Sequence, residues 1–491
     1  MDIRDVPTDR RSPPNSLAGH SPHDIERPAG TGWGSLLSGA NGVRSLALAG
    51  GVALHAINVY IATTILPSVV HDIGGLGLYA WNTTIFVVAS VLGSALSARL
   101  LQQAGPRGAY AIAAAIFTLG SVGCAIAPSM PVMLIGRLVQ GLGGGFLFAL
   151  AYAMIRIVFP EALWPRAMAL VSGMWGVATL VGPAIGGIFA ELGIWRAAFW
   201  SLVPVTLLFA VLAVAVLPKR EAGPSQHSAV PLMQLILLTA AVLAISAGSA
   251  SLDLTRNAAG IVVAVVLAVL LVNAESRSRQ KLLPSGAFRP RSTIAALYAT
   301  MALLAVTVTS GEVFVPLFLQ VLHHQSPLFA GYLAAFMAAG WTLGSIASSG
   351  ATGIGVQRAI MVGPLLGLAG MAALCVLVPK GSAGTWLALM PICVALVAIG
   401  LGVGLAWPHL LTHVLKAARP DEQELAGASI TTIQLLATAT GAALAGLVAN
   451  AGGLIEPGGM TGTANAARWL FGMFALAPLL CLVSARRTVT V

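Results

Sequence analysis

Long apolar runs, separated by short clusters of charged, proline and glycine residues, make up most of this chain. About 20 apolar residues in a helix cross the hydrocarbon core of a bilayer. The seventh and eighth runs are short and close together, so a protein with twelve spans is the alternative. We prefer fourteen, because a soluble linker between the two halves would not need these two apolar stretches. The pattern therefore predicts fourteen transmembrane helices, at about 44–70, 80–101, 108–127, 131–157, 167–190, 197–217, 229–251, 257–273, 292–320, 327–350, 358–378, 384–412, 425–450 and 466–485.

Composition supports an all-α polytopic membrane protein. Of the 491 residues, 57% are hydrophobic and 9% are charged, and the mean hydropathy is +0.89, whereas a soluble domain carries about 25% charged residues. The net charge of +10 does not indicate nucleic-acid binding, because the basic residues form short clusters and no stripe. The four cysteines lie singly in apolar runs, so we expect neither a metal site nor a cofactor.

The basic residues orient the predicted helices, because Lys and Arg concentrate in the cytoplasmic loops of membrane proteins. With the N-terminus inside, Arg137 lies within a span and most of the 26 Lys and Arg residues fall on the cytoplasmic side. The outer loops then hold Arg196, Arg256, Lys380 and Arg468. We therefore expect a multi-pass protein of the inner membrane, with both termini in the cytoplasm.

The first six and the last six predicted spans share glycine patterns. The run that starts at Gly141 recurs at Gly400, and the run that starts at Gly182 recurs at Gly441, at the same offset. Parallel six-span repeats are typical of secondary transporters that rock two bundles around a central site. The expected domains are a disordered cytoplasmic tail at 1–42, an N-terminal six-helix bundle at 43–217, a linker with two additional helices at 218–291 and a C-terminal six-helix bundle at 292–487.

Arg137 lies in the middle of the fourth predicted span. An arginine at that depth costs about 2.5–3.5 kcal/mol on insertion scales, so it needs a partner or a water-filled cavity. Arg137 either sets the electrostatic potential of a central cavity or acts as a structural tie, and both can hold. Gln140 lies one turn further along the same face, where it either lines the pathway or binds Arg137.

Glu312 is the only carboxylate that the predicted spans place deep inside the hydrocarbon. Burial favours the protonated form of a carboxylate, and a bound cation favours the ionised form. This is the chemistry that exchange of a proton for a cation requires. The alternatives are a protonated glutamic acid that is hydrogen-bonded near the bend at Pro316, or one whose side chain reaches the outer surface of the membrane.

Polar residues on the first predicted span and glycines on the fifth are further candidates for a role in proton transfer or helix packing. His55 and Asn58 share a face of the first span, where His55 is either a proton carrier or an ordinary packing residue. In the fifth span, Gly182 and Gly186 permit close helix contact, and Pro183 supplies a bend.

These motifs resemble those of the major facilitator superfamily, and within it the fourteen-span drug:proton antiporters. Arg137, Gln140 and Gly141 are similar to the family's Arg-x-x-Gln-Gly motif in the fourth span. The resemblance covers about 44–487 and implies a major facilitator fold, with two pseudo-symmetric six-helix bundles plus two additional linker helices. The fifth span resembles the antiporter motif of that subfamily at Gly182, Pro183, Gly186 and Gly187.

Two regions depart from the subfamily pattern. The loop between the second and third spans carries Gln102 and Gln103 where the family has an acid and an adjacent base. The first span carries Asn58 where the drug exporters usually have an acidic residue, and Asn58 cannot carry a proton. Proton coupling would then fall to Glu312.

We expect a monomeric secondary transporter that exports amphipathic organic compounds, including drugs, in exchange for protons. Its partners would be the small-molecule substrate, protons and the lipid bilayer. An exporter or facilitator of a neutral or anionic metabolite, siderophore or lipid with weak proton coupling is the alternative, which Asn58 favours. A membrane-embedded lipid-modifying enzyme is a remote alternative, because the sequence shows no catalytic cluster.

Overall fold

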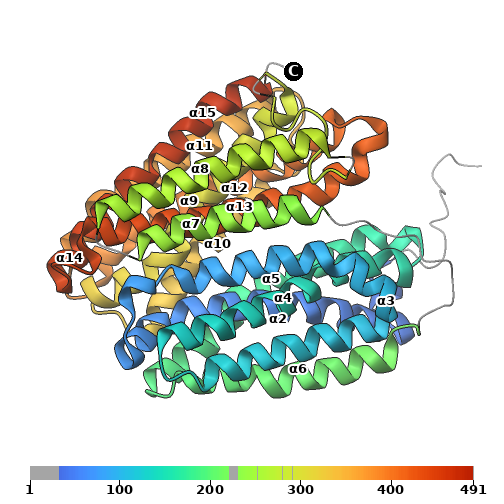
Figure 1. The fold of residues 1–491 in the computed structure, drawn as a ribbon, viewed down its shortest axis with the longest axis horizontal. Helices are drawn as coiled ribbons and strands as arrows, with labels where there is room; N and C mark the ends of the chain where they lie inside the picture. The colour runs from blue at the N-terminus through green and yellow to red at the C-terminus, as the bar shows by residue number, and fades with distance from the viewer. Residues whose placement is uncertain (1–31, 220–230, 251–252, 279, 290, 490–491) are drawn as a thin grey trace, which may run out of the picture.

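The computed structural model of the protein is built from helices (Figure 1). It describes residues 32–219, 231–250, 253–278, 280–289 and 291–489. Within those ranges, thirteen helices are long and apolar enough to cross a membrane. The protein is therefore an all-helical, multi-pass membrane protein.

Most of the predicted spans coincide with one helix each. The helices are α1 (Trp33–Leu37), α2 (Gly39–Ile73), α3 (Trp81–Ala125), α4 (Met130–Val158), α5 (Trp164–Glu191), α6 (Arg196–Val216), α7 (Leu232–Ser249), α8 (Leu254–Arg277), α9 (Thr293–Leu322), α10 (Pro327–Ser348), α11 (Ile354–Leu377), α12 (Trp386–Ala417), α13 (Gln423–Ala449), α14 (Gly459–Phe474) and α15 (Leu476–Val489). Short helical turns lie between them: η1 (Leu76–Leu78), η2 (Glu161–Leu163), η3 (Val378–Lys380), η4 (Pro420–Glu422) and η5 (Asn450–Leu454).

The helix α3 contains two of the predicted spans, 80–101 and 108–127. Its 45 residues would extend about 68 Å as a straight helix, which is more than twice the hydrocarbon thickness. Gly105 interrupts the helix with a φ of 67° and a ψ of 175°, a conformation that glycine adopts readily. Pro106 follows and removes a backbone donor. The chain therefore leaves helical geometry between the two predicted spans.

Both arms of α3 lie alongside α4. In the first arm, a Cβ atom on Gly93 would collide with the backbone of Leu142. In the second arm, the backbone of Phe117 occupies the space that a Cβ atom on Gly143 would need. Because Leu142 and Gly143 are neighbours, the two arms pass the same level of α4, and α3 folds back on itself at Gly105.

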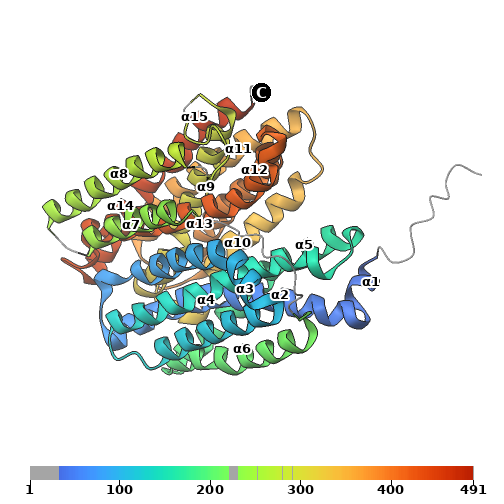
Figure 2. The same ribbon diagram turned by 45° about the vertical axis from the view of Figure 1, so that its right-hand side comes forward.

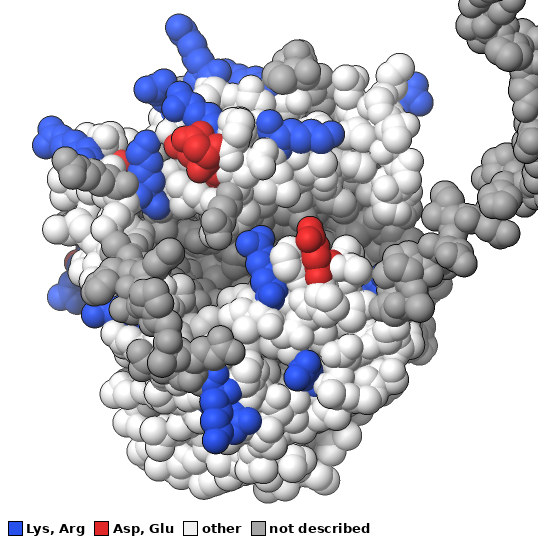
Figure 3. Space-filling model, turned by 90° about the vertical axis from the view of Figure 1, so that its right-hand side faces the viewer, with Lys and Arg blue, Asp and Glu red and all other residues white. Residues whose placement is uncertain are grey.

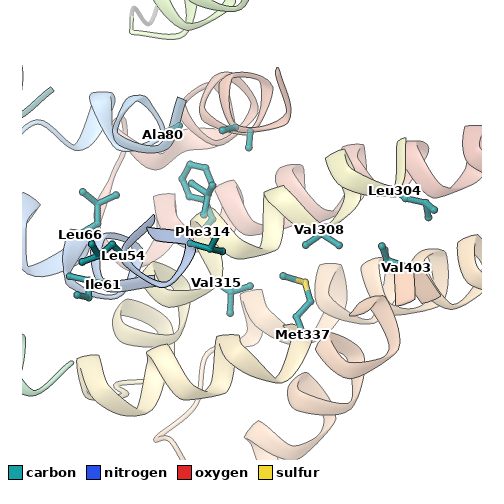
Figure 4. Packing of buried hydrophobic residues seen from close by; sticks show 14 of the residues in the cluster. Leu54, Ile61, Leu66, Ala80, Leu304, Val308, Phe314, Val315, Met337 and Val403 are labelled. Carbon is teal, nitrogen blue, oxygen red and sulfur yellow. The ribbon is translucent and has the colours of Figure 1, made fainter. Parts of the chain in front are cut away.

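The helices form two groups (Figures 1 and 2). Helices α2–α6 pack together, and α9–α15 pack together above them. Helices α7 and α8 contact each other, and α7 also lies against α13. Where the groups meet, α2 contacts α9 and α10. A Cβ atom on Gly311 of α9 would lie 3.4 Å from the end of the Met337 side chain of α10, and Figure 4 shows Met337 with the buried Phe314 and Val315 of α9.

The expected tail at 1–42 extends too far along the chain. Helix α1 occupies Trp33–Leu37, and α2 begins at Gly39. The side chain of Leu36 is fully buried, and the hydroxyl of Ser45 donates to its carbonyl at 3.0 Å. An apolar segment that packs on the first turns of α2 is therefore part of the fold, while residues 1–31 lie outside the described residues.

Close backbone contact holds α3 against α4. A Cβ atom on Gly141 would lie 2.9 Å from the Cβ of Ala89 and would collide with the carbonyl of Phe86. The hydroxyl of Ser90 donates to the carbonyl of Gly141 at 3.1 Å. Small residues at such contacts let helices approach and gain packing energy in a membrane, where no hydrophobic effect drives them together.

Glycines of α5 make similar contacts. A Cβ atom on Gly182 would collide with the Cβ of Tyr60, and one on Gly186 would lie 3.0 Å from the carbonyl oxygen of Ile61. These two glycines therefore bring α5 close to α2. Gly187 faces the other way and meets the first turn of α10, which belongs to the second group of helices.

We expect Gly141→Ala to destabilise the folded protein, because the added methyl group has no space between α3 and α4. Overpacking of this kind costs about 1–3 kcal/mol. The matched control is Gly173→Ala in α5, where a Cβ atom would meet nothing within 4 Å. Thermal unfolding in detergent should show a lower midpoint for Gly141→Ala alone; equal midpoints for the two variants would contradict the packing described here.

Candidate functional site

A small pocket lies where α2, α9 and α10 meet, between the two groups of helices. The cavity itself amounts to about 20 Å³, within a recess of about 400 Å³ that includes open solvent. Its walls are mostly apolar, and Glu312 is the charged residue among them. The lining residues are Val59, Tyr60, Thr63 and Thr64 of α2, Glu312 and Pro316 of α9, and Gly331, Ala334, Ala335, Met337 and Ala338 of α10.

Helix periodicity places Glu312 in this pocket. Glu312 and Pro316 are four residues apart and share a face of α9, while Phe314, on another face, is fully buried. Tyr60 of α2 lines the same pocket. A carboxylate and an aromatic ring attract organic cations through charge and cation–π contact. In this conformation the cavity of about 20 Å³ is smaller than such a ligand.

Arg137 is 1% exposed and lies inside the first group of helices. Its Nη1 donates to Oε1 of Gln140 at 2.5 Å, and its Nε donates to the carbonyl of Asn82 at 3.4 Å. Its guanidinium lies 4.1 Å from the centre of the Phe86 ring. Gln140 in turn donates from Nε2 to the hydroxyl of Ser121 at 2.8 Å. Gln140 thus binds Arg137, and the chain Arg137–Gln140–Ser121 ties α4 to both arms of α3.

His55 and Asn58 lie beside this arrangement and are both buried. The imidazole ring of His55 lies 5.3 Å from the ring of Phe86 and 5.3 Å from that of Phe148, measured between centroids. Asn58 is fully buried, and its side-chain oxygen and nitrogen have no partner among the described residues. The side-chain oxygen and nitrogen of Asn82 also have no hydrogen-bond partner among the described residues. Buried amides without partners are uncommon, so the first group holds an unusually polar interior around Arg137.

The structure does not bring Arg137 and Glu312 together. Among the described residues, no carboxylate lies within ion-pair distance of Arg137. Its partners belong to α3 and α4, whereas the pocket around Glu312 is lined by α2, α9 and α10. Gln140, the carbonyl of Asn82 and the ring of Phe86 surround the guanidinium, so Arg137 and Glu312 do not share one pocket in this conformation.

The two groups of helices are in contact at the end of the molecule where α2 and α5 end. The rings of Tyr79 and Phe314 lie 5.2 Å apart. The amide of Leu328, at the start of α10, donates to the carboxylate of Glu191 at 3.3 Å. In the same region a Cβ atom on Gly331 would lie 3.0 Å from Pro183. Access to the pocket from this end is therefore blocked by contacts between the groups.

The opposite end, where α2 begins and α15 ends, is hollowed between the two groups (Figure 3). Lys and Arg side chains, with fewer Asp and Glu side chains, lie on this face around the depression. Together with the contacts at the other end, this arrangement leaves the space between the two groups open at one end of the molecule and closed at the other.

Asp72 lies at the end of α2 and links it to neighbouring helices. Its carboxylate forms an ion pair with Arg196 at 2.5 Å, and Nε1 of Trp195 donates to it at 3.1 Å. Arg196 also donates to the carbonyl of Ala127 at 3.1 Å. These contacts join the end of α2 to the start of α6 and to the end of α3.

Asn82 and Ser121 are the site residues that the sequence did not single out. Both lie in apolar stretches of α3, and both are fully buried. The sequence does mark them as candidates, because a polar residue inside a membrane span needs a partner. Their connection to Arg137 could not be read from the sequence, since Asn82 and Ser121 lie 55 and 19 residues away from the groups that they bind.

Comparison with known proteins identifies the family. A model of the Major Facilitator Superfamily matches residues 48–442, which is most of the chain. A protein of Mycobacterium tuberculosis (strain ATCC 25618 / H37Rv), named as a probable multidrug-efflux transporter, is 39% identical over 431 residues, covering 85% of this chain and 89% of that protein. The multidrug transporter protein MdtP of Bacillus subtilis (strain 168) is 25% identical over 401 residues, covering 81% and 73%.

Solved structures share the fold. A POT family transporter in complex with 5-aminolevulinic acid matches with a TM-score of 0.66 at 14% identity, covering 94% of this chain and 98% of that one. The nucleoside transporter NupG matches with a TM-score of 0.63 at 12% identity, covering 91% and 99%. The family comprises transporters, which excludes the lipid-modifying enzyme. The expected family is confirmed: this chain belongs to the major facilitator superfamily of membrane transporters.

Proposed function

We propose that the protein exports amphipathic organic compounds, among them drugs, across the inner membrane in exchange for protons. The relatives named as multidrug transporters cover most of the chain and support this substrate class. The observation that carries the proposal is the position of Glu312 in the pocket where the two groups of helices meet. A carboxylate at that place can release a proton when a cationic substrate binds and take one up when the substrate leaves.

The proposed architecture has fourteen crossings. The break at Gly105 and the packing of both arms of α3 along α4 support two crossings within α3. The proposed units are an N-terminal six-helix bundle (43–217), a linker that carries α7 and α8 (218–291) and a C-terminal six-helix bundle (292–487). An even number of crossings places both termini on one side, and the Lys and Arg side chains of the hollowed face support the cytoplasm as that side.

Alternating access then follows from the contacts between the groups. In this conformation a substrate would reach the pocket from the cytoplasm, through the hollowed face. Opening toward the outside would require the groups to separate at Tyr79, Phe314 and Glu191. We propose that protonation of Glu312 removes the charge that holds a cation and so permits release on the outer side.

Replacement of Glu312 by Gln should abolish proton-driven export and leave the fold intact, because the amide keeps the shape of the side chain but cannot exchange a proton. We expect efflux of a cationic dye driven by a pH gradient to fall to the level of vesicles without the protein, since an intramembrane acid that exchanges protons is lost. The measurement is dye uptake into inverted membrane vesicles.

Glu422→Gln provides the matched control, because Glu422 lies in the turn between α12 and α13. There the hydroxyl and the amide of Ser285 donate to its carboxylate, and these bonds hold the pKa of Glu422 below its usual range. This variant should retain dye transport. Wild-type proton coupling in Glu312→Gln would remove Glu312 from the mechanism.

We propose that Arg137 serves mainly as a structural tie of the N-terminal bundle. Removing Gln140 takes away its charged hydrogen bond, and such bonds are worth about 1.5–3 kcal/mol. Gln140→Ala should therefore lower the midpoint of thermal unfolding in detergent markedly, and transport should fall with the amount of folded protein.

Ser121→Ala is the control, since it removes a neutral hydrogen bond from Gln140, worth about 0.5–1.5 kcal/mol, and leaves the bond to Arg137 intact. Its midpoint should fall less than that of Gln140→Ala. If Gln140→Ala instead folds as stably as the wild type but loses transport, Gln140 acts in the pathway and not as a tie.

A second candidate is an exporter or facilitator of neutral or anionic compounds with weak proton coupling. Two observations favour it: Asn58 stands in place of an acid, and Arg137 has no carboxylate partner among the described residues. A susceptibility panel in a host without its own efflux pumps separates the candidates. Protection against cationic dyes supports the proton antiporter, whereas protection confined to anionic compounds supports the second candidate.

A further inference from the structure

A groove on the outside of the second group of helices stands apart from the pocket around Glu312. It lies between the start of α9, the end of α15 and the segment that precedes α9. Its lining includes Phe288, Ala295, Ala299, Leu480, Val483 and Arg487. The space amounts to about 770 Å³, part of it open to the surroundings.

The groove is mostly apolar, with Ser484 in its lining and the basic Arg487 at one end. On α15, Leu480, Val483 and Arg487 follow helical spacing, so they share one face. Leu480 and Val483 are 56% and 57% exposed, although they belong to a candidate membrane span that ends at Thr488. Arg487 lies at the end of that span, at the depth where a long basic side chain reaches the membrane surface.

The wall formed by the segment before α9 is held in place. The hydroxyl of Ser292, at the start of α9, donates to the carbonyl of Gly286 at 2.6 Å within the segment. The amide of Ser285 donates to the carboxylate of Glu422 at 3.0 Å, which fastens the segment to the turn between α12 and α13. The groove is therefore a formed feature of the fold, since its wall is folded onto α9 and bonded to the turn before α13.

We infer that this groove binds an anionic phospholipid, with an acyl chain along α9 and α15 and the phosphate near Arg487. Figure 1 shows α15 at the outer edge of the second group, away from the space between the groups. A groove at that place faces the bilayer, so its apolar walls meet acyl chains. Arg289 and Arg291 lie in the same segment as Phe288 and add positive charge at the surface. Basic pockets between membrane helices on this side of a bilayer bind anionic headgroups.

The test measures lipid binding to the purified full-length protein in detergent by native mass spectrometry, with phosphatidylglycerol and phosphatidylcholine as probes. Arg487→Gln should bind phosphatidylglycerol roughly fivefold more weakly, as expected for loss of one basic charge near an anionic surface. Arg486→Gln is the control, because it removes the same charge from a residue that does not line the groove. Phosphatidylcholine binding should be similar in all three proteins.

A second pair of variants tests the acyl-chain part of the groove. Ala299→Phe fills the groove and should reduce binding of both lipids, whereas Ala268→Phe adds the same bulk at an exposed position on α8 and should not. Inorganic phosphate should not compete with phosphatidylglycerol, since it brings no acyl chain. Equal phosphatidylglycerol binding by Arg487→Gln and Arg486→Gln, or unchanged binding by Ala299→Phe, would overturn the inference.

Discussion

A charged or polar group within the hydrocarbon core must be satisfied by the protein itself, and this constraint governs the structure. Arg137 meets it through Gln140, the carbonyl of Asn82 and the face of Phe86. Glu312 meets it differently, because it lies in a small pocket between two groups of helices. A group that is fully enclosed keeps its charge state, whereas one beside a pocket can exchange protons and ligands. The two residues are therefore suited to different roles in transport.

Close backbone packing makes this division possible. Gly141 and its neighbours let α3 and α4 approach until side chains are excluded from the contact, which encloses Arg137. Gly182 and Gly186 do the same for α5 and α2, the helix that supplies Tyr60 to the pocket. Rigid groups built in this way can move as units, and the proposed alternating access depends on such movement.

Much of the fold could be predicted from the sequence, since apolar length and glycine spacing are local properties. Arg137, Gln140 and Glu312 were recognised because polar residues in apolar runs are conspicuous. What the sequence could not supply were contacts between distant segments. The bond from Arg137 to Asn82, the ion pair of Asp72 with Arg196 and the position of Tyr60 beside Glu312 all depend on tertiary packing. The short helix α1 (Trp33–Leu37) could not be predicted, because it has few apolar residues and packs against α2.

The central claim is that substrates enter the pocket around Glu312 from the hollowed face. Its most direct test places one cysteine at Ala335, which lines the pocket, in a variant without the four native cysteines. A membrane-impermeant thiol reagent is then applied to sealed vesicles from each side, with and without an exported cationic dye. We predict labelling from the side of the chain termini and protection by the dye. Labelling that the dye leaves unchanged would contradict the claim.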